Sequence, residues 1–389
     1  MGAPLSWRAC AGALALLLGR GLAAEVPLFP TQAAPAAAAS NDPAAGFDWK
    51  LPRGFPVPYV PAGNPMTAAK VSLGRRLFFE PRLSVDGRTS CASCHRPELA
   101  FTDGRPRAVG ATGEQHPRSA MSLTNVAYNA SFTWADPSFD SLEAQVLQPM
   151  YNQHPVEMGL TGREAEVLTA LRADPRYPRL FANAFSAAAD PISIANLARA
   201  LACFERTLIS GRSAFDRYVY DDDRAALSAA ARRGMALFYE RAGCAQCHSG
   251  INFSGAVRTV AAPSVAATYA NTALYNVDGH GTYPPDAPGI RAVTGNAQDE
   301  GRFRVPTLRN IAVTAPYMHD GSAATLAEVV EHYSAGGRQE PLGPTANNAL
   351  KDPRIRALQL SAQEKADLVA FLESLTDEQF LHDRRFRAD

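Results

Sequence analysis

The sequence predicts an all-α protein in which two similar units follow one another along the chain. Three observations predict this fold: apolar residues recur at helical spacing, no sustained strand-like alternation is found, and one short pattern occurs twice. The chain has 389 residues, of which 46% are hydrophobic and 20% charged, which is ample material for a core in each unit. Lys plus Arg equals Asp plus Glu at 38 each, so no basic surface for nucleic acid is expected.

The first residues have the features of a secretory signal rather than of a membrane helix. Residues 1–24 combine an early arginine, an apolar run at Ala9–Leu18 and small residues near the end. That run is shorter than the ~20 residues that a membrane span needs. Residues 25–46 are rich in Ala, Pro and Ser and are expected to form a flexible leader. No later run is long enough to cross a membrane, so we expect an exported, soluble, periplasmic protein.

Four of the six cysteines form two CxxC pairs, each followed at once by a histidine. The residues are Cys91, Cys94 and His95 in the first copy and Cys244, Cys247 and His248 in the second. Two thiols one helical turn apart can add to the two vinyl groups of one haem, and the adjacent histidine then binds the iron. A thiol redox motif would need a βαβ setting, which is not visible, and a zinc site would need the four thiolates to meet in space. The two complete copies therefore predict two c-type haems.

A repeated stretch stands before each of these motifs. The first copy, residues 74–80, reads GRRLFFE and is separated from Cys91 by ten residues; the second, residues 234–240, reads GMALFYE and is separated from Cys244 by three residues. Each copy predicts a short helix with a Leu-Phe-aromatic patch. The repeat predicts two tandem cytochrome-c-like domains, an N-terminal one at 47–222 and a C-terminal one at 223–389.

Other segments show the periodicity and capping signals of helices. Residues 192–208 carry apolar side chains at helical spacing, which are Ile194, Leu197, Leu201, Phe204 and Leu208. Cys203 lies in this run and is expected to be a buried apolar residue. Capping boxes at Ser361 and Thr325 predict two further helix starts, and Gly336 ends the second of these helices.

Six stretches make the chain resemble the bacterial di-haem cytochrome c peroxidase and MauG family over residues 65–375. They are LGRRLFF at 73–79, SCASCH at 90–95, FTDGR at 101–105, HPVEMG at 154–159, VPTLRN at 305–310 and APYMHDG at 315–321. In this family one haem reacts with hydrogen peroxide, a second stores or relays an electron, and a tryptophan lies between them. The resemblance therefore implies that His95 binds the iron of the peroxide-reacting haem and His248 that of the second haem. It makes Trp134 the bridging tryptophan; the alternative for Trp134 is a core aromatic.

The peroxide side of the first haem needs an acid/base group, because heterolysis moves a proton from the inner to the outer peroxide oxygen. The resemblance implies that Glu157 has this role, that Gln145 is the distal amide, and that Pro149 packs over the iron. Taken alone, Gln145 would be read as a surface helix residue and Pro149 as a loop former. Their joint spacing favours the functional interpretation.

The sixth position of the first iron is expected to be open. In resting peroxidases of the family a loop histidine can fill it, and the corresponding place here is Ala111. His116 and His154 are the two histidines that could overturn this expectation. A lone histidine is more often structural or exposed.

The distal ligand of the second haem separates the subfamilies. In the peroxidases a methionine stands fourteen residues after the histidine of the PYxHDG motif, which is His319 here, and that position is Tyr333. A tyrosine at this place is typical of MauG-like enzymes. A phenolate is hard and anionic and stabilises high-valent iron, whereas a thioether raises the potential. Met318 is the rival ligand, and a core tyrosine is the alternative for Tyr333.

The family also holds a calcium ion between its domains through backbone carbonyls and an asparagine. The resemblance implies that Thr314 and Pro316 supply the carbonyl donors. The asparagine position is Ser119 here. Because Ca²⁺ prefers 6–8 oxygens, a serine side chain or water could substitute.

These features lead to three functional hypotheses. The resemblance implies a periplasmic enzyme that uses hydrogen peroxide to reach a high-valent two-haem state and oxidises aromatic residues of a partner protein. Stretches at 118–123, 154–159 and 331–337 particularly resemble the methanobactin-associated members, which are thought to convert tryptophan to kynurenine in a periplasmic copper-binding partner. The alternative is a cytochrome c peroxidase that draws electrons from a small cytochrome c or cupredoxin, and Tyr333 argues against it. A plain electron carrier would have no use for Glu157 and Gln145.

Overall fold

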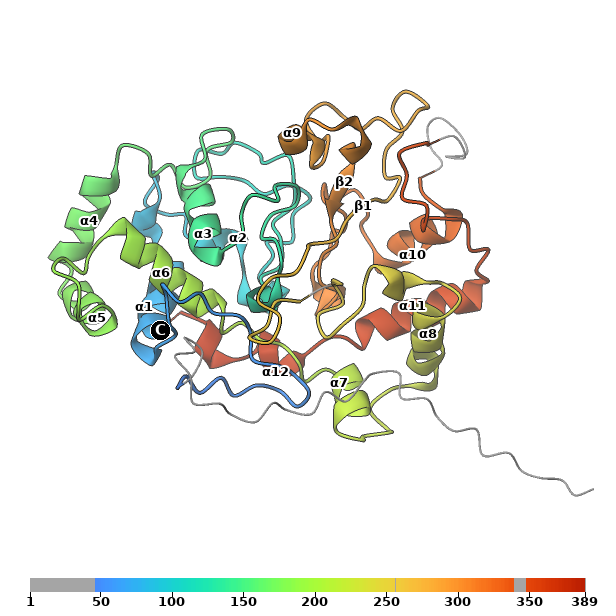
Figure 1. The fold of residues 1–389 in the computed structure, drawn as a ribbon, viewed down its shortest axis with the longest axis horizontal. Helices are drawn as coiled ribbons and strands as arrows, with labels where there is room; N and C mark the ends of the chain where they lie inside the picture. Colours follow the sequence, from blue (N-terminus) through green and yellow to red (C-terminus); the bar gives the residue numbers. More distant parts are fainter. Residues whose placement is uncertain (1–45, 256, 339–347, 389) are drawn as a thin grey trace, which may run out of the picture. The chain divides into compact units, whose positions relative to one another are not determined.

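The computed structural model describes residues 46–255, 257–338 and 348–388 (Figure 1). The expected signal at 1–24 and nearly all of the expected leader at 25–46 lie outside these residues. Within the described ranges, no helix is long and apolar enough to cross a membrane. The described residues are mostly helical, as predicted. The small sheet of β1 (Tyr269–Asn271) and β2 (Arg302–Arg304) was not predicted; its strands pair antiparallel.

Two pairs of helices form the framework. In the first pair α1 (Ala68–Phe78) packs on α6 (Ile194–Glu205), and in the second α8 (Ala229–Tyr239) packs on α11 (Ala362–Glu373) (Figure 1). The helices between and after them are α2 (Cys91–Cys94), α3 (Leu142–Tyr151), α4 (Glu164–Ala173), α5 (Arg176–Ala184), α7 (Ala214–Tyr220), α9 (Arg291–Thr294), α10 (Leu326–Ala335) and α12 (Glu378–Leu381).

The repeated stretch of the sequence makes the same helix crossing in both pairs. A Cβ atom on Gly74 of α1 would lie 1.9 Å from the carbonyl oxygen of Ala200 on α6. A Cβ atom on Gly234 of α8 would lie 1.9 Å from the carbonyl oxygen of Asp367 on α11. At both crossings the backbones therefore approach so closely that only glycine fits. The sequence repeat is thus also a structural repeat.

The predicted helix boundaries are confirmed with one correction. At the start of α11 the Ser361 hydroxyl accepts a hydrogen bond from the Glu364 N–H, and the Glu364 carboxylate accepts one from the Ser361 N–H. At the start of α10 Thr325 caps the helix as predicted, but the Glu328 carboxylate bonds the N–H one residue before the cap. Half of that predicted capping box is therefore wrong. Gly336 ends α10 in the left-handed conformation, as predicted.

The largest apolar core lies around α1, α3, α4, α5 and α6. Cys203 is fully buried on α6, as expected, and burial raises the pKa of its thiol to about 11. Phe380 and Phe386 near the C-terminus join this core, and the rings of Phe101 and Phe380 lie 5.8 Å apart. The end of the chain therefore packs with its N-terminal helices. The domain division at 222/223 stays a prediction.

Candidate functional site

The first CxxCH motif is held as a single helical turn followed by an oriented histidine. Cys91 and Cys94 begin and end α2, and both side chains are half-buried. The Nδ1 atom of His95 lies 2.8 Å from the carbonyl oxygen of Phe101. Because a carbonyl only accepts, Nδ1 carries the proton and Nε2 keeps its lone pair for a metal.

The second motif repeats this arrangement on a tighter turn. Cys244 opens a 3-10 turn, Cys247 follows it, and Nδ1 of His248 lies 2.8 Å from the carbonyl oxygen of Phe253. Burial lowers the pKa of both His95 and His248. Both imidazoles are therefore held neutral with Nε2 available, which is the form that binds iron.

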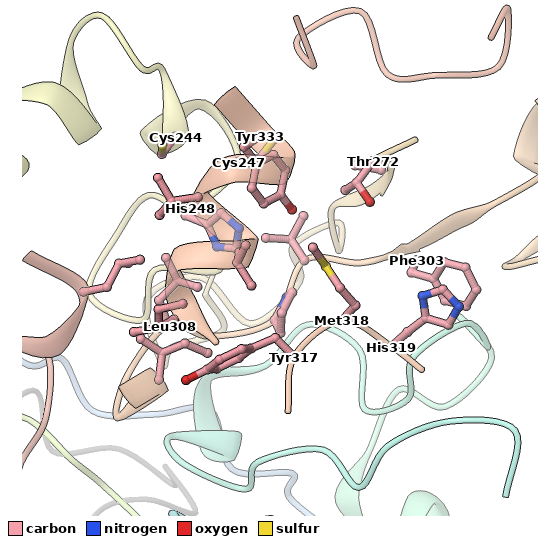
Figure 2. A pocket seen from close by; sticks show the side chains of 18 of the residues that line it. Cys244, Cys247, His248, Thr272, Phe303, Leu308, Tyr317, Met318, His319 and Tyr333 are labelled. Atoms are coloured by element: carbon pink, nitrogen blue, oxygen red, sulfur yellow. The ribbon is translucent and has the colours of Figure 1, made fainter. Parts of the chain in front are cut away.

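The second motif opens on an apolar cavity that also contains both candidate distal ligands. The Tyr333 hydroxyl on α10 and the Met318 sulfur point into the cavity that His248 faces (Figure 2). The cavity wall is otherwise largely apolar; it includes Leu308, Ile311, Val329, Val330, Leu368 and Leu372. An apolar cavity beside two thiols and a neutral imidazole fits a covalently attached haem.

The phenol of Tyr333 differs from the thioether of Met318 in its need for a hydrogen-bond partner. In the described part of the chain no hydrogen bond ends on the Tyr333 hydroxyl, and burial raises the pKa of this phenol. Tyr333 is half-buried and lines the cavity, so its hydroxyl needs a partner once a bound group fills the cavity and excludes water, whereas a thioether needs no hydrogen bond. Coordination to a metal would give the phenol oxygen its missing partner.

Trp134 lies on the wall of the same cavity. Its indole N–H donates to the carbonyl oxygen of Ser119 at 3.0 Å, and its own carbonyl accepts from the Arg304 N–H at 2.8 Å. The side chain of Trp134 is thus held by Ser119, and its backbone is held by Arg304 on β2. The tryptophan lies where a group bound at His248 would meet it.

The distal residues of the first site come from α3 and from the loop after it. Gln145 and Pro149 lie one turn apart on α3, and Pro149 has no N–H to bond the Gln145 carbonyl. The Met158 N–H donates to the Pro149 carbonyl at 3.0 Å, which brings the neighbouring Glu157 back beside the helix. The charge of Glu157 also contributes, after burial and Asp103, to raising the pKa of Cys94 to about 11. The structure therefore brings Glu157 near both Pro149 and the first CxxCH motif.

Glu157 has the environment of an acid/base group. Burial raises the pKa of its carboxyl above the usual range, and the Asn152 amide donates to one carboxyl oxygen at 3.2 Å. The Ala111 N–H donates to the Glu157 carbonyl at 2.7 Å, so the loop at the expected histidine position packs directly on this segment.

The two histidines that could fill the sixth position of the first iron have the following surroundings, and the open position stays a prediction. Nδ1 of His116 accepts from the Arg118 N–H at 3.1 Å, and burial lowers the pKa of this histidine to about 4. His154 is exposed to solvent. Among the described residues, no hydrogen bond or ring contact joins either histidine to His95 or Glu157.

The three expected calcium donors line the same cavity as Trp134. They are Ser119, Thr314 and Pro316. No hydrogen bond between described residues ends on the carbonyl oxygen of Thr314 or Pro316, and the Ser119 hydroxyl lies 3.2 Å from the Met318 carbonyl. In the described ranges no group of three or more His, Cys, Asp or Glu could hold a metal.

Comparison with known proteins decides the family. The family described as di-haem cytochrome c peroxidase matches residues 68–224, and the cytochrome c family matches residues 231–376. The methylamine utilization protein MauG of Methylorubrum extorquens is 37% identical over 342 residues, 87% of each chain. The cytochrome-c peroxidase IdrP1 of Denitromonas iodatirespirans is 38% identical over 360 residues, 87% of this chain and 91% of that one. This chain belongs to the di-haem cytochrome c peroxidase and MauG family.

A solved structure is similar over nearly the whole of its own chain. A MauG-like protein associated with microbial copper homeostasis is 42% identical, with a TM-score of 0.84 over 88% of this chain and 99% of that one. As a family member, this protein is an oxidoreductase that acts with peroxide. Its two cytochrome c units imply two c-type haems.

Sequence reasoning missed a buried cation beside the second site. Arg304 on β2 lines the cavity and donates to the Thr133 carbonyl at 3.1 Å and to the Met121 sulfur at 3.6 Å. It has no carboxylate partner among the described residues, and burial lowers the pKa of its guanidinium to about 10. Nε2 of His319, on the same wall, is buried without a partner. An anionic haem propionate fits these groups. The one signal in the sequence that could have indicated this site is an arginine within a short buried strand.

Proposed function

We propose that this protein is a MauG-like enzyme that uses hydrogen peroxide to oxidise aromatic residues, tryptophan above all, of a partner protein. One observation carries the proposal: the half-buried phenol of Tyr333 faces the cavity of His248, where a peroxidase needs methionine, and no hydrogen bond between described residues ends on its hydroxyl. A hard anionic ligand favours higher oxidation states of iron over the reduced state. The protein is therefore suited to removing electrons from a substrate rather than to receiving them from a carrier.

Each functional side chain then has a defined task. When bound, the haem pair supplies reduction of peroxide and holds the oxidising equivalents. Cys91, Cys94 and His95 hold the first haem, and Cys244, Cys247, His248 and Tyr333 hold the second. Glu157 takes the proton from the inner peroxide oxygen and returns it to the outer one, while Gln145 and Pro149 shape the space beside it. Trp134 connects the two haems.

The similarity to a copper-associated protein suggests the partner's class. The 42% identical structure is described as associated with microbial copper homeostasis. We infer a periplasmic copper-binding protein as the partner, a secretory signal at residues 1–24, and a calcium ion held by Thr314, Pro316 and Ser119. This assignment rests on similarity at the level of the family.

A second candidate is a cytochrome c peroxidase that receives electrons from a small cytochrome c or a cupredoxin. The observation that favours it is the Met318 sulfur, which points into the same cavity as Tyr333 (Figure 2). Methionine ligation would raise the potential of the second haem and allow a carrier to reduce it.

One experiment separates the two candidates. One equivalent of hydrogen peroxide is added to the fully oxidised protein without reductant, and absorbance is followed into the near infrared, where charge shared by two oxidised haems absorbs. A prompt, long-lived band supports the MauG-like function. No reaction until one haem has been reduced would establish the peroxidase instead.

A further inference from the structure

A cluster of four rings connects the cavity wall with the protein surface. Phe303 and His319 line the cavity and stack with their centroids 3.7 Å apart. Tyr283 lies 6.0 Å from Phe303 and 6.3 Å from His319, and Tyr275 lies 5.5 Å from Tyr283 and 6.4 Å from His319. Consecutive rings in contact therefore lead from Phe303 and His319 on the cavity wall to Tyr275, and Trp134 packs on the same cluster.

Tyr275 is the ring of this cluster that reaches solvent. Phe303, His319 and Tyr283 are each less than 10% exposed, whereas Tyr275 is half-buried. Two residues further on, Val277 is 59% exposed, the highest value among the large apolar side chains that are exposed in the described part. An apolar side chain in water beside a surface ring suits contact with an aromatic residue of another protein.

The hydroxyl of Tyr275 donates to the carboxylate of Asp320. Other tyrosines in or beside the cluster have neutral acceptors: Tyr283 donates to the Asn271 amide oxygen at 3.0 Å, and Tyr269 to the Ser131 hydroxyl at 2.7 Å. A phenol loses its proton when it loses an electron, and a carboxylate can take that proton whereas an amide oxygen or a hydroxyl cannot hold it. Tyr275 is thus the tyrosine of the cluster equipped for oxidation.

A guanidinium above the Tyr275 ring is compatible with oxidation of this tyrosine. The Arg338 guanidinium lies 5.2 Å from the Tyr275 ring centroid. A positively charged ring would be repelled by Arg338. Transfer of the proton to Asp320 as the electron leaves keeps the ring neutral, so the carboxylate removes this obstacle.

We propose that Tyr275 is the surface relay through which oxidising equivalents leave the protein, with Asp320 as its proton acceptor; this inference rests on the proposed function. In the forward step the Tyr275 phenol gives one electron to the oxidised haem pair and its proton to Asp320, which leaves a neutral tyrosyl radical and a carboxylic acid. In the return step an indole or phenol of the partner gives one electron to the radical, and Asp320 gives the proton back. Hydrogen peroxide is the oxidant; it takes two electrons and two protons and becomes two waters.

The test uses the full haem-loaded protein with three variants. Tyr275→Phe removes the phenol, Asp320→Asn keeps the shape but removes the base, and Tyr269→Phe is the matched control for a tyrosine of the same cluster without a carboxylate. Each is mixed with peroxide and frozen for electron paramagnetic resonance, with ring-deuterated tyrosine to identify tyrosyl signals. A nitroso spin trap followed by peptide mass spectrometry locates the radical, and N-acetyl-tryptophanamide serves as the external substrate.

We expect the wild type and Tyr269→Phe to give a deuterium-sensitive tyrosyl signal with the trap on the peptide that contains residue 275. Tyr275→Phe should lose the tyrosyl signal and the trapped peptide, and Asp320→Asn should lose most of each. These two variants should also oxidise the probe more slowly than the wild type, although all variants form the same near-infrared band. If Tyr275→Phe keeps the tyrosyl signal and the rate of probe oxidation, the relay is overturned and the proposed function stands. If the wild type forms no near-infrared band, both are overturned.

Discussion

At the scale of single residues, Glu157 is the side chain on which the peroxide reaction should depend most. Glu157 is half-buried near the first CxxCH motif, and the Asn152 amide donates to its carboxylate. We predict that Glu157→Gln and Glu157→Ala keep both haems attached but slow the reaction with peroxide by roughly 100- to 10,000-fold, which is the range for loss of a general acid/base. Stopped-flow absorbance measures the rate. The control is Glu114→Gln on the adjoining loop, where a glutamine oxygen can still accept from the Val156 N–H; unchanged kinetics in Glu157→Gln would remove the assignment.

The pH dependence of the same reaction tests Glu157 without changing its shape. Burial raises the pKa of this carboxyl, so it becomes protonated at a higher pH than an exposed glutamate does. Because the carboxylate form accepts the peroxide proton, we predict that the rate falls as pH decreases through this raised pKa. A wild-type profile of rate against pH should show the acidic limb, and Glu157→Gln should not. A limb that persists in the variant would belong to another group.

Tyr333 and Met318 can be separated by the reduction potential of the second haem. If the phenol is the ligand, Tyr333→Phe should alter the absorbance and raise the potential of that haem, because an anionic ligand stabilises the oxidised iron. Met318→Leu, on the same cavity wall, should leave the potential nearly unchanged. Potentiometric titration of each variant gives the answer. A shift confined to Met318→Leu would make methionine the ligand and favour the peroxidase.

At the scale of helices, the two close backbone crossings limit which residues can replace Gly74 and Gly234. A Cβ atom on Gly234 would lie 1.9 Å from the Asp367 carbonyl and 2.9 Å from the Phe371 Cβ, so α8 and α11 would have to separate. We predict that Gly234→Ala lowers the free energy of unfolding by ~1–3 kcal/mol, the cost of overpacking a core, despite the better helix propensity of alanine. Gly63→Ala is the control, because no atom lies within 4 Å of its added Cβ. Thermal unfolding of both proteins measures the difference; equal midpoints would contradict the crossing.

Local signals were enough to predict the helices of both framework pairs and α10. The periodicity of residues 192–208, the capping box at Ser361 and the terminating Gly336 each depend on neighbours within one or two turns. β1 and β2 have only three residues each, so no alternation could develop, and their pairing, such as that of Ala270 with Phe303, joins residues distant in the sequence. The return of Phe380 to the N-terminal core depends on contacts nearly three hundred positions apart, such as that with Phe101.

The residues of the candidate site likewise divide into those that the local sequence predicts and those that depend on partners distant in the sequence. The haem-attachment residues are contiguous and were predicted from spacing, and Glu157, Trp134 and Tyr333 came from resemblance. Arg304 and the pair of Tyr275 and Asp320 were not predicted, because their meaning lies in burial and in partners distant in sequence. An arginine or a tyrosine in a sequence does not reveal whether its partner is water, a carboxylate or a bound group.

At the scale of the whole molecule, the two halves meet around Trp134. The Ser119 N–H donates to the His319 carbonyl at 2.8 Å, and the Trp134 indole donates to the Ser119 carbonyl. Thr314 and Pro316 lie on the same cavity wall. A cation bound to these oxygens would fix Trp134 relative to the PYxHDG motif. If Trp134 has the proposed bridging role, metal binding and electron transfer between the haems should be linked.

This linkage gives a prediction for calcium. A ligand that binds only the folded protein stabilises it by about 2.7 kcal/mol when its free concentration is ~100 times Kd. We therefore predict that calcium raises the thermal midpoint of chelator-treated protein, and that the chelator alone reduces the near-infrared band formed with peroxide while both haems stay attached. Ser119→Asn, which supplies a longer side-chain oxygen, should lower the calcium concentration needed, and Ser119→Ala should raise it. Magnesium is the control ion, because it demands a tighter octahedral site. If neither the midpoint nor the band responds to calcium, the two halves are held at Trp134 by the protein's own hydrogen bonds, without a metal.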